Sequence, residues 1–208
     1  MTISWFGLSS FKIVGKEITI ITDPFGASSG LTEVRGGADA VIISDSANPL
    51  CNNLSSISGS PFIIQGPGEY DIKGAFIIGT PAEKDGNGTV IYSIELEDIR
   101  IAFLGPIKQA VLTDAQKATL EGSDIVLVPV GDKTVLDFEQ AAKVATQLEP
   151  YIIIPHSYAI PGLKIGFDKL DKFLKEMGSE AAEEDKLTVK KKDMMGDTTK
   201  LFILTPQR

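Results

Sequence analysis

Histidine is almost absent from this chain of 208 residues, in which His156 is the only one. Catalytic zinc sites usually take three ligands from the protein, and imidazole is the commonest of them. One histidine and one distant cysteine, Cys51, cannot build such a site without unusual help from carboxylates. The sequence therefore argues against a histidine-based catalytic metal centre.

Cysteine is equally scarce, and long apolar runs are missing. Because Cys51 is the only cysteine, no disulfide can form within the chain, and a reducing compartment is the natural location. No apolar run approaches the roughly 20 residues that span a bilayer, and residues 1–6 lack the basic and apolar regions of a signal peptide. We therefore expect a cytoplasmic protein with no membrane partner.

Basic residues are too few to favour nucleic acid as a partner. Lysine and arginine number 20 against 28 aspartates and glutamates, so the formal net charge is −8. An acidic surface repels phosphate backbones at long range. The one dense basic run, residues 190–192, follows an alternating stretch and fits the solvated end of a strand. We expect no nucleic-acid partner.

The first half of the chain consists of short runs rich in Ile, Val and aromatic residues, which are typical of β-strands. We expect strands at residues 2–6, 11–14, 17–22, 38–43, 61–65, 75–78, 90–96 and 99–104. Gly15 and Lys16 predict a tight turn between the second and third runs, and residues 83–88 predict a hairpin tip. The polar stretch 44–60 is expected to be irregular.

Helix signals are confined to the second half. Thr113 and Gln116 form a capping-box pattern for a helix that ends near Leu120. The apolar residues of 137–148 fall on one face of a helix. A third, amphipathic helix is expected over 167–177, where a glycine follows it.

The second half also contains strand patterns at 125–130 and 151–154, while 186–191 and 200–205 are expected to pair and close the chain. The acidic stretch 180–185 is interpreted as a solvated loop or helix end. Antiparallel strands followed by alternating helices and strands favour an α/β fold of the αββα type, with two packed mixed β-sheets and helices on the outer faces. Since no internal repeat or linker is visible, we expect one domain, residues 1–208.

Several motifs resemble those of the metallo-β-lactamase superfamily, in particular its small branch of zinc-dependent hydrolases of the ascorbate-lactonase type. The matching segments extend over essentially the whole length and are residues 7–11 (GLSSF), 22–25 (TDPF), 38–44 (ADAVIIS), 66–70 (GPGEY), 127–131 (LVPVG) and 154–158 (IPHSY). The resemblance implies the metallo-β-lactamase fold and, in an intact member, metal-dependent hydrolysis.

The resemblance also places the family's metal ligands, and at each place this chain has a different residue. The family motif His-x-His-x-Asp-His should follow Ser44 directly. Its four ligand positions are occupied here by Asp45, Ala47, Pro49 and Leu50. The positions of the other two family motif histidines, the bridging aspartate and the final histidine are occupied by Leu8, Lys84, Pro106 and Ser157, so the resemblance implies a vacated site.

This exchange removes the donors that a metal ion needs. A zinc or manganese ion takes several deprotonated donors at about 2.0–2.3 Å, whereas methyl groups and prolines offer none and an ammonium repels the cation. We therefore predict no metal cofactor and no metal-activated water. His156 precedes the last ligand position by one residue, and adjacent side chains of an extended segment point to opposite faces.

Four residues near the vacated site are weak candidates for residual catalysis: Asp45, Glu69, Lys84 and His156. His156 could act as a general base, although a histidine with satisfied contacts at a strand end is the better interpretation. Asp45, Glu69 and Asp23 could form a carboxylate cluster, but turn and loop hydrogen bonds explain Asp23 and Glu69 better. Lys84 could replace the metal charge in an ion pair or be solvated at the hairpin tip.

Two classes of function stay open at this point. The first is a degenerate metallo-β-lactamase-fold protein without a functional metal site, which binds a small molecule in the vacated cavity or serves in assembly as a homo-oligomer. The second is a hydrolase of lactone or phosphodiester type with a rearranged or metal-free site. We favour the non-enzyme, although fold alone never fixes function. A nucleic-acid processing factor is disfavoured by the net charge of −8.

Overall fold

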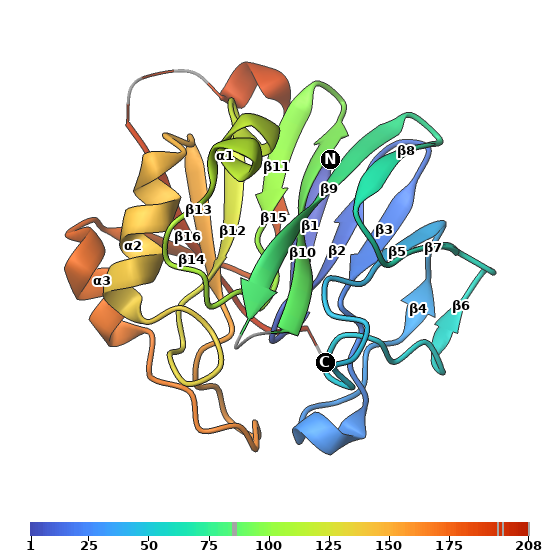
Figure 1. The fold of residues 1–208 in the computed structure, drawn as a ribbon, viewed down its shortest axis with the longest axis horizontal. Coiled ribbons are helices and arrows are strands. Elements are labelled where there is room, and N and C mark those ends of the chain that lie inside the picture. Colours follow the sequence, from blue (N-terminus) through green and yellow to red (C-terminus); the bar gives the residue numbers. More distant parts are fainter. Residues whose placement is uncertain (85–86, 195, 197, 208) are drawn as a thin grey trace.

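Two mixed β-sheets packed face to face form the centre of the molecule (Figure 1). The structure is a computed structural model, which describes residues 1–84, 87–194, 196 and 198–207, without the side chains of residues 84 and 87. The first sheet has six strands, in the order β15 (Leu187–Thr188), β1 (Thr2–Gly7), β2 (Ser10–Val14), β3 (Thr19–Thr22), β5 (Ala40–Ile42) and β7 (Phe62–Ile64). The second has eight, in the order β14 (Ala181–Glu184), β16 (Lys200–Leu204), β13 (Ile152–His156), β12 (Ile125–Pro129), β11 (Ile99–Phe103), β10 (Asn87–Leu96), β9 (Ala75–Lys84) and β8 (Gly68–Ile72). This architecture confirms the expected fold class.

The two predicted hairpins are present. The Gly15 amide donates to the Ile18 carbonyl at 2.9 Å, and β2 and β3 pair antiparallel beyond this turn. The second hairpin joins β9 and β10, which pair from Lys84 opposite Asn87 to Phe76 opposite Glu95. Residues 85 and 86, at the expected tip, lie outside the described residues.

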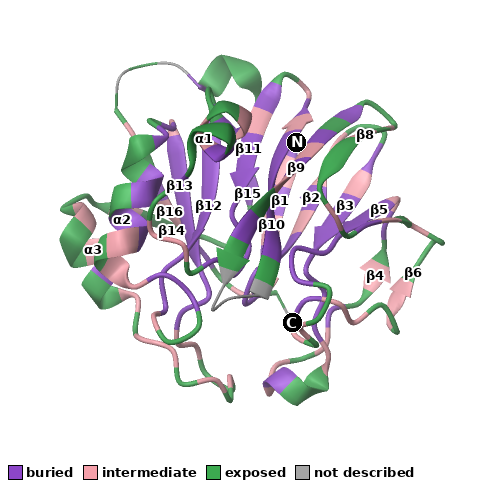
Figure 2. Ribbon diagram, in the orientation of Figure 1, coloured by how far each residue is buried: buried purple, intermediate pink, exposed green. Residues whose placement is uncertain are grey.

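Strand alternation places the core between the sheets, where Figure 2 shows buried residues along both. Ile3 and Trp5 of β1 point inward while their neighbours are half-buried, as period-two alternation requires. They meet Phe103 of β11 and Tyr92 of β10, which belong to the same buried cluster. Inside the sandwich, the Trp5 and Phe11 rings lie 6.4 Å apart.

The α-helices of the described chain lie on the eight-stranded sheet: α1 (Asp114–Leu120) contacts β9 and β10, α2 (Phe138–Gln147) packs on β12, and α3 (Asp171–Met177) packs on α2. The capping box predicted at Thr113 is formed, and α2 begins with a capping box that was not predicted from the sequence. The Gln116 amide donates to the Thr113 hydroxyl at 3.3 Å, and α2 has the same arrangement at Asp137. Among the described helices none is both long and apolar enough to cross a membrane.

The outer face of the six-stranded sheet is covered in a different way from the expectation of helices on both faces. Here the long segment between β3 and β7 folds back on the sheet, with η1 (Ala27–Ser29) and a small ribbon of β4 (Gly36–Gly37) and β6 (Ile57–Ser58). Its Phe25 and Val34 pack on Ile21 and Val41. This segment has no apolar run of helical period, so an irregular cover forms, and β6 falls within the stretch expected to be irregular.

The C-terminal part corrects three predictions. The predicted pairing of 186–191 with 200–205 is wrong, because β15 pairs with β1 and β16 pairs with β13 and β14. The acidic stretch expected as a loop or helix end contains edge strand β14. The third helix begins at Asp171 and not at 167, because the Asp168 amide donates to the Gly131 carbonyl and holds the chain in a loop. Strand partners distant in sequence leave no local signal.

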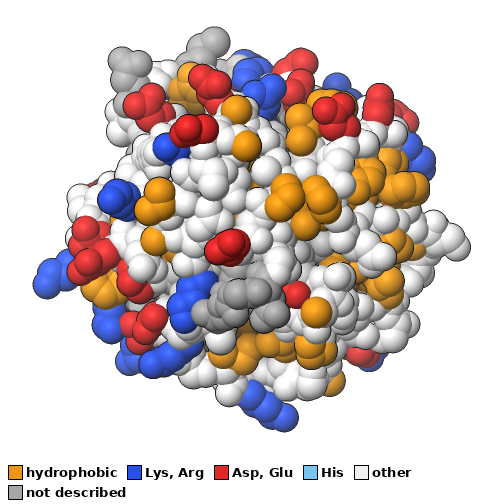
Figure 3. Space-filling model, in the orientation of Figure 1, with side chains coloured by type: hydrophobic (Ala, Val, Ile, Leu, Met, Phe, Trp, Pro, Cys, Tyr) orange, Lys and Arg blue, Asp and Glu red, His pale blue; other side chains and the backbone are white. Residues whose placement is uncertain are grey.

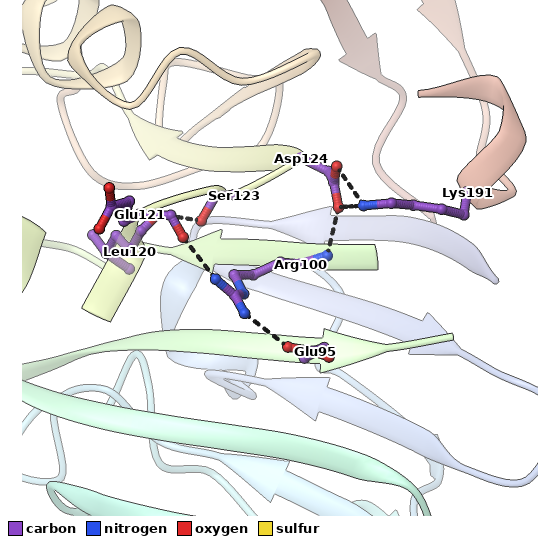
Figure 4. A network of polar contacts seen from close by, with 7 residues as sticks. All are labelled: Glu95, Arg100, Leu120, Glu121, Ser123, Asp124 and Lys191. Atoms are coloured by element: carbon purple, nitrogen blue, oxygen red, sulfur yellow. Dashed lines mark hydrogen bonds and ion pairs between the residues drawn. The ribbon is translucent and has the colours of Figure 1, made fainter. Parts of the chain in front are cut away.

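A polar network at one edge of the sandwich ties the C-terminal segment to the second sheet (Figure 4). Asp124 is 3% exposed, and its carboxylate accepts a hydrogen bond from the Arg100 backbone amide at 2.9 Å. Lys191 Nζ lies 2.9 Å from each of the two carboxylate oxygens and donates to both. Lys191 belongs to η2 (Lys191–Asp193). Arg100 continues the network to Glu95 at 3.0 Å. The buried carboxylate is therefore compensated by one amide and one ammonium.

The Lys191→Met substitution should lower the free energy of unfolding by about 1–3 kcal/mol, because it leaves the Asp124 carboxylate without its cation. Urea unfolding followed by circular dichroism measures this. Lys192→Met is the matched control, since Lys192 is exposed in the same helical turn, and should change stability by less than about 0.5 kcal/mol. Adding Asp124→Asn to Lys191→Met should recover part of the loss. Equal effects of the two lysine substitutions would contradict the assignment.

Candidate functional site

The loops that follow β1, β5, β11, β12 and β13 meet at one edge of the sandwich, the lower edge in Figure 1. Leu8, Leu50, Pro106 and Ser157 extend from four of these loops and line one cavity of about 30 Å³. These are four of the eight positions that the resemblance assigned to metal ligands. The volume corresponds to roughly one water molecule.

The rest of the wall combines apolar and weakly polar side chains. It consists of Ser9, Asn48, Cys51, Thr134, Val135, Ile165 and Phe167. No carboxylate and no imidazole belongs to this wall in the described part of the chain. The cavity therefore presents hydroxyls, one amide and one thiol among carbon atoms.

Backbone contacts bring the two ends of the site together. The Leu8 carbonyl accepts from the Ser157 amide at 3.2 Å and from the Trp5 indole at 2.9 Å. Leu8 and Ser157 both adopt left-handed backbone conformations, with φ of 50° and 54°. Such conformations are uncommon outside glycine, asparagine and aspartate. Leu8 and Ser157 therefore both stand in tight turns, and neither has a side chain that is a good metal ligand.

Of the remaining assigned positions, none whose side chain the structure describes lines the cavity. Ala47 and Pro49 are exposed, because the loop turns at Asn48, whose amide donates to the Asp45 carbonyl at 3.1 Å. Asp45 is 7% exposed but outside the cavity wall. The backbone of Lys84 lies at the end of β9, and its side chain is outside the described residues. The structure therefore brings together half of the eight positions.

Two of the candidate carboxylates are near each other and the third is not. Asp23 is fully buried at the end of β3, and the negative charge of Asp45 acts on it. Glu69 is exposed on edge strand β8 and contributes nothing to the cavity wall. The alternative of a cluster of three carboxylates, which the sequence made less favourable, is therefore limited to Asp23 and Asp45.

Asp23 fastens the loop that follows β5. Its carboxyl group accepts from the Ser44 amide at 2.7 Å and from the Ser44 hydroxyl at 2.6 Å. The Ser44 carbonyl in turn accepts from the Thr89 hydroxyl at 2.8 Å and the Val90 amide at 2.9 Å, so the network reaches β10 of the other sheet. The sequence suggested a turn cap for Asp23, because nothing local marks Ser44 as its partner.

Burial sets the protonation of Asp23. Loss of water raises its pKa from the ordinary value of 3.8 to about 7, an effect that Asp45 strengthens and that the hydrogen bonds from Ser44 and Ser9 oppose. The group is thus partly protonated near neutral pH. Because both carboxyl oxygens of Asp23 accept hydrogen bonds from Ser44, we interpret the group as a structural one in a hydrogen-bond network beside the cavity.

His156 lies between the sheets and not in the cavity wall. Its Nδ1 is 2.9 Å from the Ser157 hydroxyl, and its ring meets Phe11 edge-on at 5.5 Å and lies 6.4 Å from Phe103. Its Nε2 has no hydrogen-bond partner among the described residues. Burial lowers its pKa from 6.5 to about 3, which a contact with the Leu127 backbone offsets only in part, so the ring is neutral.

These residues do not fit a metal ion. Three of the four cavity-lining ligand positions carry leucine or proline, and the fourth, Ser157, offers only a hydroxyl. Asp23 and Asp45 lie outside the wall. Across the part of the chain that the structure describes, no group of three or more His, Cys, Asp or Glu side chains is arranged to hold a metal.

Comparison with known proteins places this geometry in a family. The family model described as "Beta-lactamase superfamily domain" matches residues 2–157. A solved structure from Thermotoga maritima, named as a Zn-dependent hydrolase of the metallo-beta-lactamase superfamily, is 29% identical with a TM-score of 0.83 and covers 98% of this chain and 97% of that one. No curated protein matches.

More distant structures share the fold. Igni18, a metallo hydrolase from Ignicoccus hospitalis, is 16% identical with a TM-score of 0.69, covering 100% of this chain and 96% of that one. The metallo-beta-lactamase fold protein YhfI from Bacillus subtilis is 10% identical with a TM-score of 0.62, covering 99% and 97%. At these identities the likeness concerns the fold alone.

Asp23 and His156 should give opposite pH dependences of stability. The folded state raises the pKa of Asp23 from 3.8 to about 7, so its contribution is full at low pH and is lost as the pH rises to 7. The folded state lowers the pKa of His156 from 6.5 to about 3, so its contribution is full above pH 6.5 and is lost as the pH falls. Between about pH 4 and 6.5 the two effects oppose each other.

Asp23→Asn and His156→Asn separate the two effects. We expect the stability of Asp23→Asn relative to the parent to rise with pH, and that of His156→Asn to fall, each by up to about 1.4 kcal/mol per pH unit. Urea unfolding at pH 4.5, 5.5 and 6.5 measures both slopes. Variant profiles that stay parallel to the parent's would show that neither group titrates as its burial requires.

Proposed function

The chain belongs to the beta-lactamase superfamily, and we propose that within it this protein is a non-catalytic member that keeps the fold as a scaffold. The observation that carries the proposal is the cavity at the family's metal position. Leu8, Leu50 and Pro106 fill this place with carbon atoms, and the remaining volume is about 30 Å³. A ligand sphere of imidazoles and carboxylates has no counterpart there.

The protonation states of the nearby groups support the same proposal. A general base works best with a pKa near the working pH and within hydrogen-bond reach of the substrate. His156 is enclosed between aromatic rings, and burial lowers its pKa to about 3. Asp23 has a pKa of about 7, but its oxygens are engaged by Ser44. Neither group is presented to a substrate.

The size of the cavity favours assembly over small-molecule binding. A drug-sized or metabolite-sized ligand needs some hundreds of cubic ångströms, so it would have to displace Leu50, Ile165 or Phe167 from the wall. We therefore propose that the protein acts through its surface, by assembly. In this proposal it is a cytoplasmic homo-oligomer of a single-domain chain. Cys51, the only cysteine and a buried one, is consistent with a reducing compartment.

Metal analysis tests the proposal. Protein purified without chelator from medium containing zinc, manganese and iron should carry only substoichiometric metal. Its melting temperature should not fall on addition of EDTA, because no bound ion contributes to folding. The Thermotoga maritima relative, purified in parallel, is the comparison.

Two results would overturn the proposal. Stoichiometric metal in the protein would show a ligand set that the geometry does not reveal. Turnover of any member of a panel of lactone, phosphodiester and thioester substrates would support the alternative hydrolase, and persistence of that turnover in EDTA would identify a metal-free site.

A further inference from the structure

Edge strands expose backbone amides and carbonyls, and proteins usually protect them with charge or cover. Within the described chain the two large sheets end at β7, β8, β14 and β15. β8 carries Glu69 and Asp71, and β14 carries Glu183 and Glu184, all of them exposed. β15 is two residues long and follows Lys186. Three of these edges therefore have a charge or are very short.

The fourth edge, β7, lacks this protection. No charged residue occurs anywhere in residues 46–68, although 23% of the whole chain is charged. Phe62 of β7 is 54% exposed, and Leu54 of the same segment is 36% exposed. The Phe62 ring contacts Tyr70 of β8 at 6.3 Å between centroids. In Figure 3 hydrophobic side chains gather on the side of the molecule where β7 and β8 lie.

The backbone of β7 is half used by its own sheet. The Phe62 amide donates to the Asp39 carbonyl at 2.8 Å, and the Ile64 carbonyl accepts from the Ile43 amide at 2.7 Å. In a parallel ladder the amide and carbonyl of alternate residues point to the same neighbour. Ile63, between them, therefore turns its amide and its carbonyl to the open edge. A single residue thus offers one donor and one acceptor.

We propose that β7 of one copy pairs antiparallel with β7 of a second copy, on a two-fold axis at Ile63. The Ile63 amide donates to the carbonyl of the partner's Ile63, and the reverse bond completes the pair. Phe62 then lies opposite the partner's Ile64, which brings exposed aromatic surface into contact. Two six-stranded sheets become continuous, and the contact closes as a dimer. This pairing specifies the surface used in the proposed assembly role. Its biological role rests on that proposed function, whereas the pairing itself is argued from the edge of β7.

The distribution of charge favours a second copy of this chain as the occupant. Two chains of net charge −8 repel each other, so they associate where neither presents charge. The same self-pairing at β8, centred on Tyr70, would set Glu69 opposite the partner's Asp71, and like charges directly opposite destabilise a ladder. At β7 the opposed residues are Pro61, Phe62, Ile63, Ile64 and Gln65, all uncharged. The charge-free edge is the one that is compatible with itself.

Sedimentation equilibrium of the purified full chain tests the pairing. The parent should show a concentration-dependent dimer, and Phe62→Lys should raise its dissociation constant by about tenfold or more, since it adds charge to both sides of the ladder. Ile63→Pro removes the outward amide without removing a bond to β5 and should also give a monomer. Val111→Lys is the matched control, because Val111 is 70% exposed and distant in sequence from the edge.

Hydrogen exchange gives a second readout that loss of folding does not imitate. The Ile63 amide should be protected at high protein concentration and exchange fast on dilution, while amides of β10 stay protected throughout. A parent that remains monomeric, a dimer that survives Phe62→Lys, or Ile63 exchange independent of concentration overturns the proposal. Metal content is measured on the same samples, so a metalloenzyme that dimerises and a metal-free monomer are told apart.

Discussion

The buried carboxyl group of Asp23 and its two hydrogen bonds to Ser44 organise the edge of the molecule that holds the cavity. Asp23 follows β3 and Ser44 follows β5, so the pair fixes the point at which the loops after these two strands begin. Through the Ser44 carbonyl the same network reaches Thr89 and Val90 of the second sheet. Burial makes the ionised carboxyl unfavourable, and its raised pKa follows from that. Both sheets are therefore joined at the cavity by hydrogen bonds that need no metal.

The cavity beside this network is lined by residues of several loops and presents mostly carbon atoms. Leu8 and Ser157 hold left-handed turns and are hydrogen-bonded to each other, an arrangement that orients side chains toward the space between the loops. Leu50 and Pro106 complete the contact from two further loops. Apolar packing among such residues stabilises the edge by removing carbon surface from water. Apolar packing and the backbone hydrogen bond between Leu8 and Ser157 thus hold these loops together at the cavity.

Local signals were enough for much of the fold, and distant partners explain the rest. The caps at Thr113 and Asp137 and the turn at Gly15 depend on residues a few positions apart, and all three are formed. β15 pairs with β1, and β16 pairs with β13 as well as with the nearer β14; the sequence pattern carries no register for these pairs. At the site, family motifs located Leu8, Leu50, Pro106 and Ser157, whereas the exposure of Ala47 and Pro49 depends on how their loop turns.

One uncharged segment, residues 46–68, connects the site to the edge of the sheet. It begins with the loop that holds Ala47, Pro49 and Leu50, crosses β6 and ends just past β7. In that loop Asn48 accepts from the Leu50 and Cys51 amides, and the Asn53 amide donates to the Pro24 carbonyl. Hydrogen bonds within the segment and to the chain beside it thus hold this loop in place. Because this segment carries no charge, burying it against another neutral surface costs little desolvation. The proposed pairing of β7 buries its edge strand in this way.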